Sequence, residues 1–185
     1  MMYRYADVQM CKWSDFCVHL HICTPANPHR MNQPVITALK ELLAGGHAHV
    51  TFEEAVKQLP AELQGQVPPG MPYSIWQLVE HIRITQWDIL EFSRNPDYAS
   101  PPWPEGYWPK ETAPPGEAAW KRSLEQIRRD KEAFLALLTA PGADLYTPFP
   151  HGTGQHLLRQ AMLIADHTSY HTGEIVVLRR MMKAW

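Results

Sequence analysis

Apolar residues recur at helical spacing in four long stretches of the chain. Residues 31–44, 75–94, 117–139 and 153–182 each place apolar side chains three or four positions apart, which is the period of one helix face. No pair of segments alternates with the two-residue period of a β-strand. The pattern therefore predicts an all-α protein, an up-down four-helix bundle whose helices pack through these apolar faces.

Local signals predict where some of these helices begin and end. Asn32 is the expected N-cap of the first helix. A capping box at residues 51–54 predicts a brief helix that ends near Pro60. A second capping box at residues 74–77 predicts the start of the second long helix.

Residues 96–116 are rich in proline and tryptophan, with the run PPWPEGYWP at 101–109. Proline lacks a backbone N–H and breaks a helix, while the aromatic side chains favour an ordered segment. We expect a decorating loop that packs across one end of the bundle. Trp103 and Trp108 could form a pocket wall, cap the core or make a contact between subunits.

The first 30 residues mix cysteine, histidine, proline and isolated aromatics without either period. We expect a disordered extension at 1–30 ahead of a domain at 31–185, with Met31 as the natural start. A genuine N-terminal arm is the alternative. All three cysteines fall in this stretch, and their odd number and six-residue spacing fit neither a closed disulfide set nor a zinc motif.

Composition and charge exclude several classes of function. The chain has 185 residues, of which 45% are hydrophobic and 19% charged, as expected for one globular domain. A net charge of −2, with no long run of Lys or Arg, argues against a large nucleic-acid interface. No apolar stretch approaches the ~20 residues that cross a bilayer, and no signal-peptide pattern is present. We expect a cytoplasmic protein without membrane or nucleic-acid partners.

Two histidines lie four residues apart within the last predicted helix. His167 and His171 share one helix face, and His171 occupies a seam position where an unpartnered imidazole would be costly. His81 borders the apolar face of the second long helix and can also point inward. If the three converge, they form a three-nitrogen site with open positions, which is the layout of a catalytic metal centre. Imidazole nitrogen suits zinc, nickel, iron or copper, so the ligand type alone does not choose the metal. We expect a divalent transition metal, zinc or nickel first, with iron or manganese as alternatives.

Glu174 follows His171 by three residues on the same face. It could orient a ligand ring or act as a base, so it is the candidate catalytic residue. The alternative is a salt bridge to Arg179 or to another cation. The other polar candidates are expected to be structural, with Asp88 in a hydrogen bond and His151 and His156 as loop and cap residues.

Two stretches resemble the DinB/YfiT-like superfamily. SIWQLVEHI at 74–82 is similar to the second helix of that family, and the C-terminal stretch that contains ADHTSYHTGEI at 165–175 is similar to its last helix. The resemblance extends over roughly residues 31–185. It implies a four-helix bundle, commonly a homodimer, that binds a divalent metal through the residues His81, His167 and His171.

Known members of this family include thiol S-transferases that use low-molecular-weight thiols, and enzymes described as metal-dependent hydrolases. The histidines and the resemblance together favour an enzyme that activates a thiol or a water for attack on a small electrophilic substrate. Two alternatives stay open. One is a non-catalytic metal or small-ligand binding bundle, and the other is an apolar bundle whose histidines only form hydrogen bonds.

Overall fold

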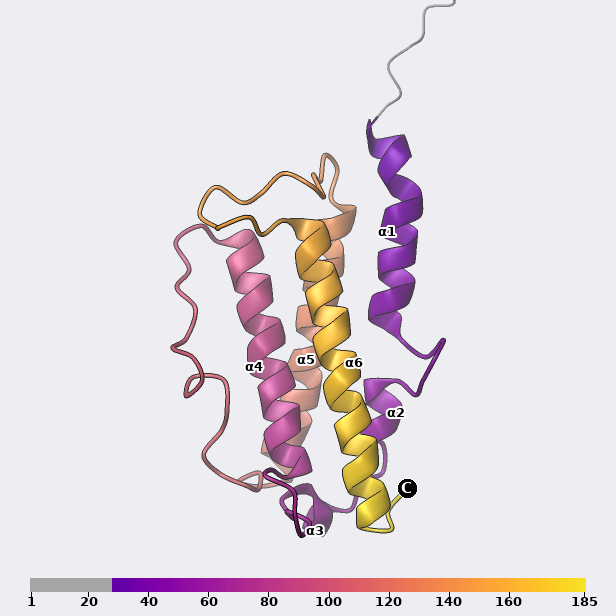
Figure 1. Ribbon diagram of the computed structural model, residues 1–185, viewed down its shortest axis with the longest axis vertical. Coiled ribbons are helices and arrows are strands. Elements are labelled where there is room, and N and C mark those ends of the chain that lie inside the picture. The colour runs from indigo at the N-terminus through magenta and orange to yellow at the C-terminus, as the bar shows by residue number, and fades with distance from the viewer. Residues whose placement is uncertain (1–27) are drawn as a thin grey trace, which may run out of the picture.

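The computed structural model describes residues 28–185, and every regular element within them is an α-helix. Two short helices, α2 (Phe52–Val56) and α3 (Ala61–Gln64), lie at one end of the molecule. Four long helices have roughly aligned axes (Figure 1): α1 (Pro28–Ala44), α4 (Ile75–Arg94), α5 (Glu117–Thr139) and α6 (Leu157–Met181). The expected all-α class is confirmed. Within the described residues no helix combines the length and the hydropathy needed to cross a membrane.

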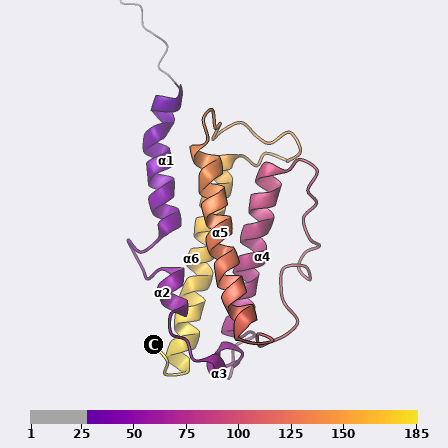
Figure 2. The same cartoon turned by 180° about the vertical axis from the view of Figure 1, so that it is seen from behind.

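The direction of the helices departs from strict alternation. Helices α4 and α5 run the same way, whereas α1 and α6 run the opposite way, as both views show (Figures 1 and 2). Successive long helices of an up-down bundle would be antiparallel. The parallel pair is possible because the long segment between α4 and α5 returns along the whole length of the bundle.

This returning segment, residues 95–116, runs along α4 and not across one end of the bundle as expected. Near the C-terminal end of α4, the Tyr107 hydroxyl donates a hydrogen bond to Asp88 Oδ2 at 2.8 Å. At the N-terminus of α4, the Ser74 hydroxyl donates to the Thr112 carbonyl oxygen. The proline content correctly excludes a helix here, but composition carries no information about which surface the segment covers.

Both capping boxes are confirmed. The side chains of Thr51 and Glu54 cap each other's backbone N–H groups at the start of α2. Ser74 and Gln77 do the same at the start of α4. Each pair satisfies two N–H groups that a helix end leaves without partners.

Three helix boundaries differ from the prediction. Helix α1 begins at Pro28, so Asn32 lies inside it and is not its N-cap. The brief helix ends at Val56 because the next residue, Lys57, is extended, with a ψ of 134°. Helix α6 begins only at Leu157, because its N-cap residue His156 is extended, with a ψ of 165°.

The expected disordered extension at 1–30 falls almost entirely outside the described residues. Only its last three residues, 28–30, are described, and they form the first turn of α1. The three cysteines also lie outside the described part of the chain.

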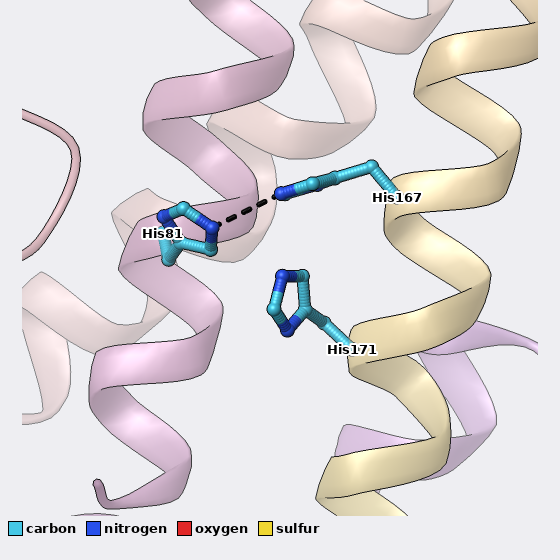
Figure 3. A group of neighbouring side chains, drawn as sticks. All are labelled: His81, His167 and His171. Atoms are coloured by element: carbon cyan, nitrogen blue, oxygen red, sulfur yellow. Dashed lines mark hydrogen bonds between the residues drawn. The ribbon is translucent and has the colours of Figure 1, made fainter. Parts of the chain in front are cut away.

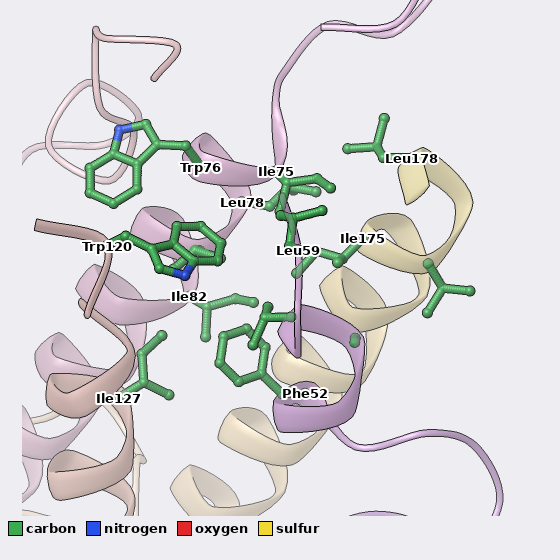
Figure 4. Packing of buried hydrophobic residues seen from close by; sticks show 14 of the residues in the cluster. Phe52, Leu59, Ile75, Trp76, Leu78, Ile82, Trp120, Ile127, Ile175 and Leu178 are labelled. Carbon is green, nitrogen blue, oxygen red and sulfur yellow. The ribbon is translucent and has the colours of Figure 1, made fainter. Parts of the chain in front are cut away.

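Buried apolar side chains form two clusters at opposite ends of the bundle. One joins α2 to the N-terminal halves of α4 and α5 and the C-terminal half of α6 (Figure 4). The other joins α1 to the remaining halves of the same helices. Buried polar side chains occupy the level between the clusters, among them Gln86, Asp130, His171 and Thr172. Such a layer needs internal hydrogen bonds, since each buried polar group left without one costs about 1–3 kcal/mol.

Arg179 ties the end of α6 to the backbone around the end of α2. Its side chain is buried, and Nη1 donates to the carbonyl oxygens of Ala55 at 2.8 Å and Lys57 at 2.9 Å. Nε donates to the Ala184 carbonyl oxygen at 2.9 Å, and the guanidinium lies 5.1 Å from the ring centre of Trp185. One side chain therefore binds three backbone carbonyl groups in two segments of the chain.

The Arg179→Ala variant is expected to lower the free energy of unfolding by about 2–4 kcal/mol, because buried carbonyl groups lose charged donors. Urea denaturation followed by circular dichroism measures this change. Arg122→Ala, which truncates an exposed arginine of α5, is the control and should change the free energy by less than about 0.5 kcal/mol. Equal stability of Arg179→Ala and the unchanged protein would contradict this role.

Candidate metal centre

Three histidine side chains meet between α4 and α6. His81 comes from α4, and His167 and His171 come from successive turns of α6 (Figure 3). One ring nitrogen of each lies within 4.8 Å of those of the other two. The Nε2 atoms of His81 and His167 are 3.0 Å apart. The structure therefore brings together the three histidines that the sequence singles out.

Burial favours the neutral form of His81 and His167. His81 is 3% exposed and His171 is 7% exposed. Burial, together with the neighbouring His171 and His81, lowers the pKa of His167 to about 3. The pKa of His81 is also lowered, chiefly by burial, although its bond to a backbone carbonyl acts in the opposite direction. Metal binding requires neutral imidazole, because the ligand is the nitrogen lone pair.

Hydrogen bonds orient two of the three rings. His81 Nδ1 lies 2.9 Å from the Tyr107 carbonyl oxygen, which can only accept, so Nδ1 carries the hydrogen. His171 Nδ1 lies 2.6 Å from Glu174 Oε2 and donates to that carboxylate in the same way. The Nε2 atom of each ring keeps its lone pair and is turned toward the cluster (Figure 3). Metal-binding histidines usually have this arrangement, so the donor set fits a metal ion.

Glu174 is held from both sides. Its Oε2 accepts from His171, and its Oε1 accepts from the Tyr73 hydroxyl. Burial and the adjacent carboxylate raise the pKa of Tyr73 well above its usual range, so the hydroxyl stays protonated and donates. The predicted partner Arg179 is wrong, since Arg179 donates to backbone carbonyl groups, and the side chain that pairs with Glu174 on α6 is His171.

The two candidate tryptophans have different environments. Trp108 stacks on His81, with ring centres 3.9 Å apart and planes at 7°. Trp108 also stacks on Tyr73 at 5.6 Å. Trp103 is 71% exposed and contacts Tyr107, so it does not border the three histidines. Of the two, only Trp108 forms a wall of the site.

The remaining polar candidates have structural contacts, as expected. Asp88 accepts the Tyr107 hydroxyl hydrogen and so anchors the residue whose carbonyl orients His81. His151 Nε2 donates to a backbone carbonyl at the end of α4 over 2.8 Å. His156 is the N-cap residue of α6.

The sequence pattern does not single out Tyr73 or Tyr107, although both contact residues of the site. Tyr73 directly precedes the capping residue Ser74, which places it at the start of the helix that carries His81. Its position next to the capping residue is the one sequence signal that could have identified Tyr73 as a residue of the site. Tyr107 orients His81 through its backbone carbonyl, a group that every residue has, so no sequence signal distinguishes it.

A family model described as DinB superfamily matches residues 47–175, well over half of the chain. The matched range includes the three histidines and Glu174. The chain belongs to the DinB superfamily. Comparison with curated proteins and with solved structures gave no match. Membership of the DinB superfamily and the three-histidine cluster together fit a metal-binding protein.

The DinB-superfamily protein is expected to carry close to one divalent metal ion per chain when it is purified from metal-supplemented cells. His171→Ala should lower metal affinity by more than about 100-fold, because loss of an outer partner alone commonly costs 10–100-fold. Inductively coupled plasma mass spectrometry of the purified protein measures metal content. His47→Ala, which removes an exposed histidine from the loop after α1, is the control. Equal metal content in both variants would exclude this site.

The metal-free protein is expected to lose stability as the pH falls below about 6.5. Between the usual histidine pKa of 6.5 and the folded-state pKa of about 3 for His167, the unfolded chain binds more protons than the folded chain. The free energy of unfolding therefore decreases on acidification through this window. Urea denaturation with a chelator at pH 7.5 and pH 5 measures the effect. His167→Gln should reduce the pH dependence, and an unchanged dependence in this variant would contradict the assignment.

Proposed function

We propose that this protein is a divalent-metal-dependent enzyme that activates a thiol or a water for attack on a small electrophilic substrate. The observation that carries the proposal is the donor set of three converging imidazoles. Structural zinc sites usually have four protein ligands, whereas three ligands leave a position for a reactant. Within residues 28–185 the potential ligand cluster consists of His81, His167 and His171.

The ligand atoms, three imidazole nitrogens, favour some metals over others. Imidazole nitrogen suits zinc, nickel and iron, whereas manganese is bound more often by oxygen ligands. We therefore place zinc or nickel first, with iron or manganese as alternatives. Such an ion would supply Lewis-acid chemistry, which lowers the pKa of a thiol or a water so that a nucleophile is available near neutral pH.

Glu174 acts in this proposal as a positioning residue for His171. Each of its carboxylate oxygens already accepts a hydrogen bond, one from His171 Nδ1 and one from the Tyr73 hydroxyl. These two hydrogen bonds hold the carboxylate against His171 and Tyr73, so we assign Glu174 to orienting the ring and not to proton abstraction. Glu174 instead fixes the ring and the tautomer of His171, and Tyr73 fixes Glu174.

Aromatic side chains define two borders of the proposed site. Trp108 covers one face of His81 and so keeps water from that side. Tyr170 lies with its ring centre 5.0 Å from that of His171 and is 66% exposed. Apolar walls with a few fixed polar groups suit a small organic electrophile.

The metal-loaded protein is expected to accelerate conjugation of a low-molecular-weight thiol with monochlorobimane or an epoxide, and a chelator should abolish the reaction. We expect His171→Ala to lose more than about 100-fold in kcat/KM, and Glu174→Gln about 10–100-fold. Adduct fluorescence and chromatography of the epoxide products measure the rates. His47→Ala should retain the unchanged rate.

The same assay separates the two reactions. Consumption of the epoxide only when thiol is present would identify a thiol S-transferase, and diol formation without thiol would identify a hydrolase. If metal is bound but a broad panel of thiols, electrophiles and esters shows no turnover, the enzyme proposal fails. A metal or small-ligand binding bundle would then be the remaining function.

A further inference from the structure

A cleft of about 580 Å³ lies between α4 and α5, the two parallel helices that stand side by side in Figure 2. Helix α4 lines it with one face, made of Trp76, Glu80, Arg83 and Trp87, which follow one another at spacings of four, three and four positions. None of the three histidines lines this cleft. It is therefore a second concave site, separate from the candidate metal centre.

Small side chains of α5 leave room for the cleft. Ala119 and Ser123 line it and are both buried, at 9% and 6% exposed. Larger residues at these two positions would fill the space between the helices. The volume lies within the range of roughly 300–1,000 Å³ that is usual for small-molecule sites.

The residues that line the cleft carry positive charge. Three arginines and one glutamate give them a net charge of +2, whereas the whole chain has a net charge of −2. The glutamate, Glu80, is only 8% exposed and is fully partnered. Arg83 donates to its two oxygens at 2.9 and 2.8 Å, and the Ser123 hydroxyl donates at 2.5 Å. Glu80 and Arg83 thus neutralise each other, and the excess charge belongs to the other two arginines.

Those two arginines, Arg122 and Arg129 of α5, form no ion pair within residues 28–185. Arg129 donates to the amide oxygen of Gln126 at 3.0 Å, a neutral partner. The neighbouring Arg128, in contrast, is paired with two glutamates of the same helix. A guanidinium without a carboxylate partner at the rim of a concave site is suited to bind a carboxylate, a sulfonate or a phosphate.

Two tryptophans give the cleft apolar walls that are held in place before any ligand binds. Trp76 packs against Trp120, with ring centres 6.3 Å apart (Figure 4). Trp87 packs against Tyr98 of the returning segment, with ring centres 5.4 Å apart and planes at 89°. Eleven positions separate the two tryptophans, so they stand about three helical turns apart. Fixed aromatic rings suit an apolar or planar ligand and lose little freedom when it binds.

We propose that the cleft binds a small organic anion with an aromatic body. Arg122 and Arg129 bind its anionic group, and the tryptophans contact its apolar part. The charge requires an anion, since a neutral ligand would leave both guanidinium groups without a counter-charge. The apolar walls require a body larger than an inorganic ion. This site works independently of the metal and of the proposed enzyme activity.

Fluorescence titration of the full chain with anilinonaphthalene sulfonate, an aromatic anion, tests the proposal. N-phenylnaphthylamine, which lacks the sulfonate, is the matched neutral probe. We expect saturable binding of the sulfonate. The double variant Arg122→Ala/Arg129→Ala should weaken it by about tenfold or more and change binding of the neutral probe by less than about twofold. Both substitutions are at exposed positions, and circular dichroism checks that the variant is folded.

Arg128→Ala is the matched control. It removes the same charge from the same helix, but Arg128 lines a different groove, between α2 and α5, so binding of the sulfonate should not change. A chelator should not change it either. Absence of saturable binding, equal weakening in Arg128→Ala, or equal weakening for the neutral probe in the double variant would each overturn the proposal.

Competition identifies the anionic group. Naphthoate or naphthyl phosphate should displace the bound sulfonate, because each combines an aromatic body with an anion. Naphthalenemethanol has the same ring system without the charge and should not displace it at the same concentration. Displacement by the alcohol as effective as that by the two anions would contradict a role for the arginines.

Discussion

The structure around α4 and α6 depends on one constraint: three imidazoles meet there, with His81 and His171 buried and His167 partly buried. A buried polar ring must find partners, and three rings this close cannot all satisfy one another. Because His81 Nδ1 carries a hydrogen, its Nε2 accepts, and the hydrogen shared with His167 must come from His167 Nε2. That one hydrogen cannot serve the Nε2 lone pairs of both His81 and His171, whereas a cation would be bound by all three rings once the hydrogen of His167 lies on Nδ1. A cation is the partner that satisfies all three together.

The groups that orient these rings come from distant parts of the chain. The carbonyl that orients His81 belongs to the segment between α4 and α5, and Asp88 of α4 anchors that segment. The carboxylate that orients His171 lies one turn further along α6, and a tyrosine just before α4 holds it. The histidine geometry is therefore a property of the whole assembly of α4, α6 and the returning segment.

The sequence predicts the parts of this structure that depend on local interactions. The boundaries of α4 and α5 follow from a capping box, apolar spacing and breaking residues, all of which act within a few positions. The three histidines could be selected from the sequence because an imidazole on an apolar helix face costs free energy unless it has a partner. The course of residues 95–116 could not be predicted, since proline restricts backbone shape without selecting a surface. Tyr107 was unpredictable for a related reason, because it acts through its backbone.

The two apolar clusters on either side of the polar layer have a consequence for how the protein responds to metal supply. Small zinc domains are unfolded without their ion because the metal replaces a hydrophobic core. Here α1, α2, α4, α5 and α6 are held together by buried apolar side chains above and below the histidines. We therefore expect the protein to fold without the metal. A cell short of metal would hold a reserve of folded, empty protein that later supply could load without new synthesis.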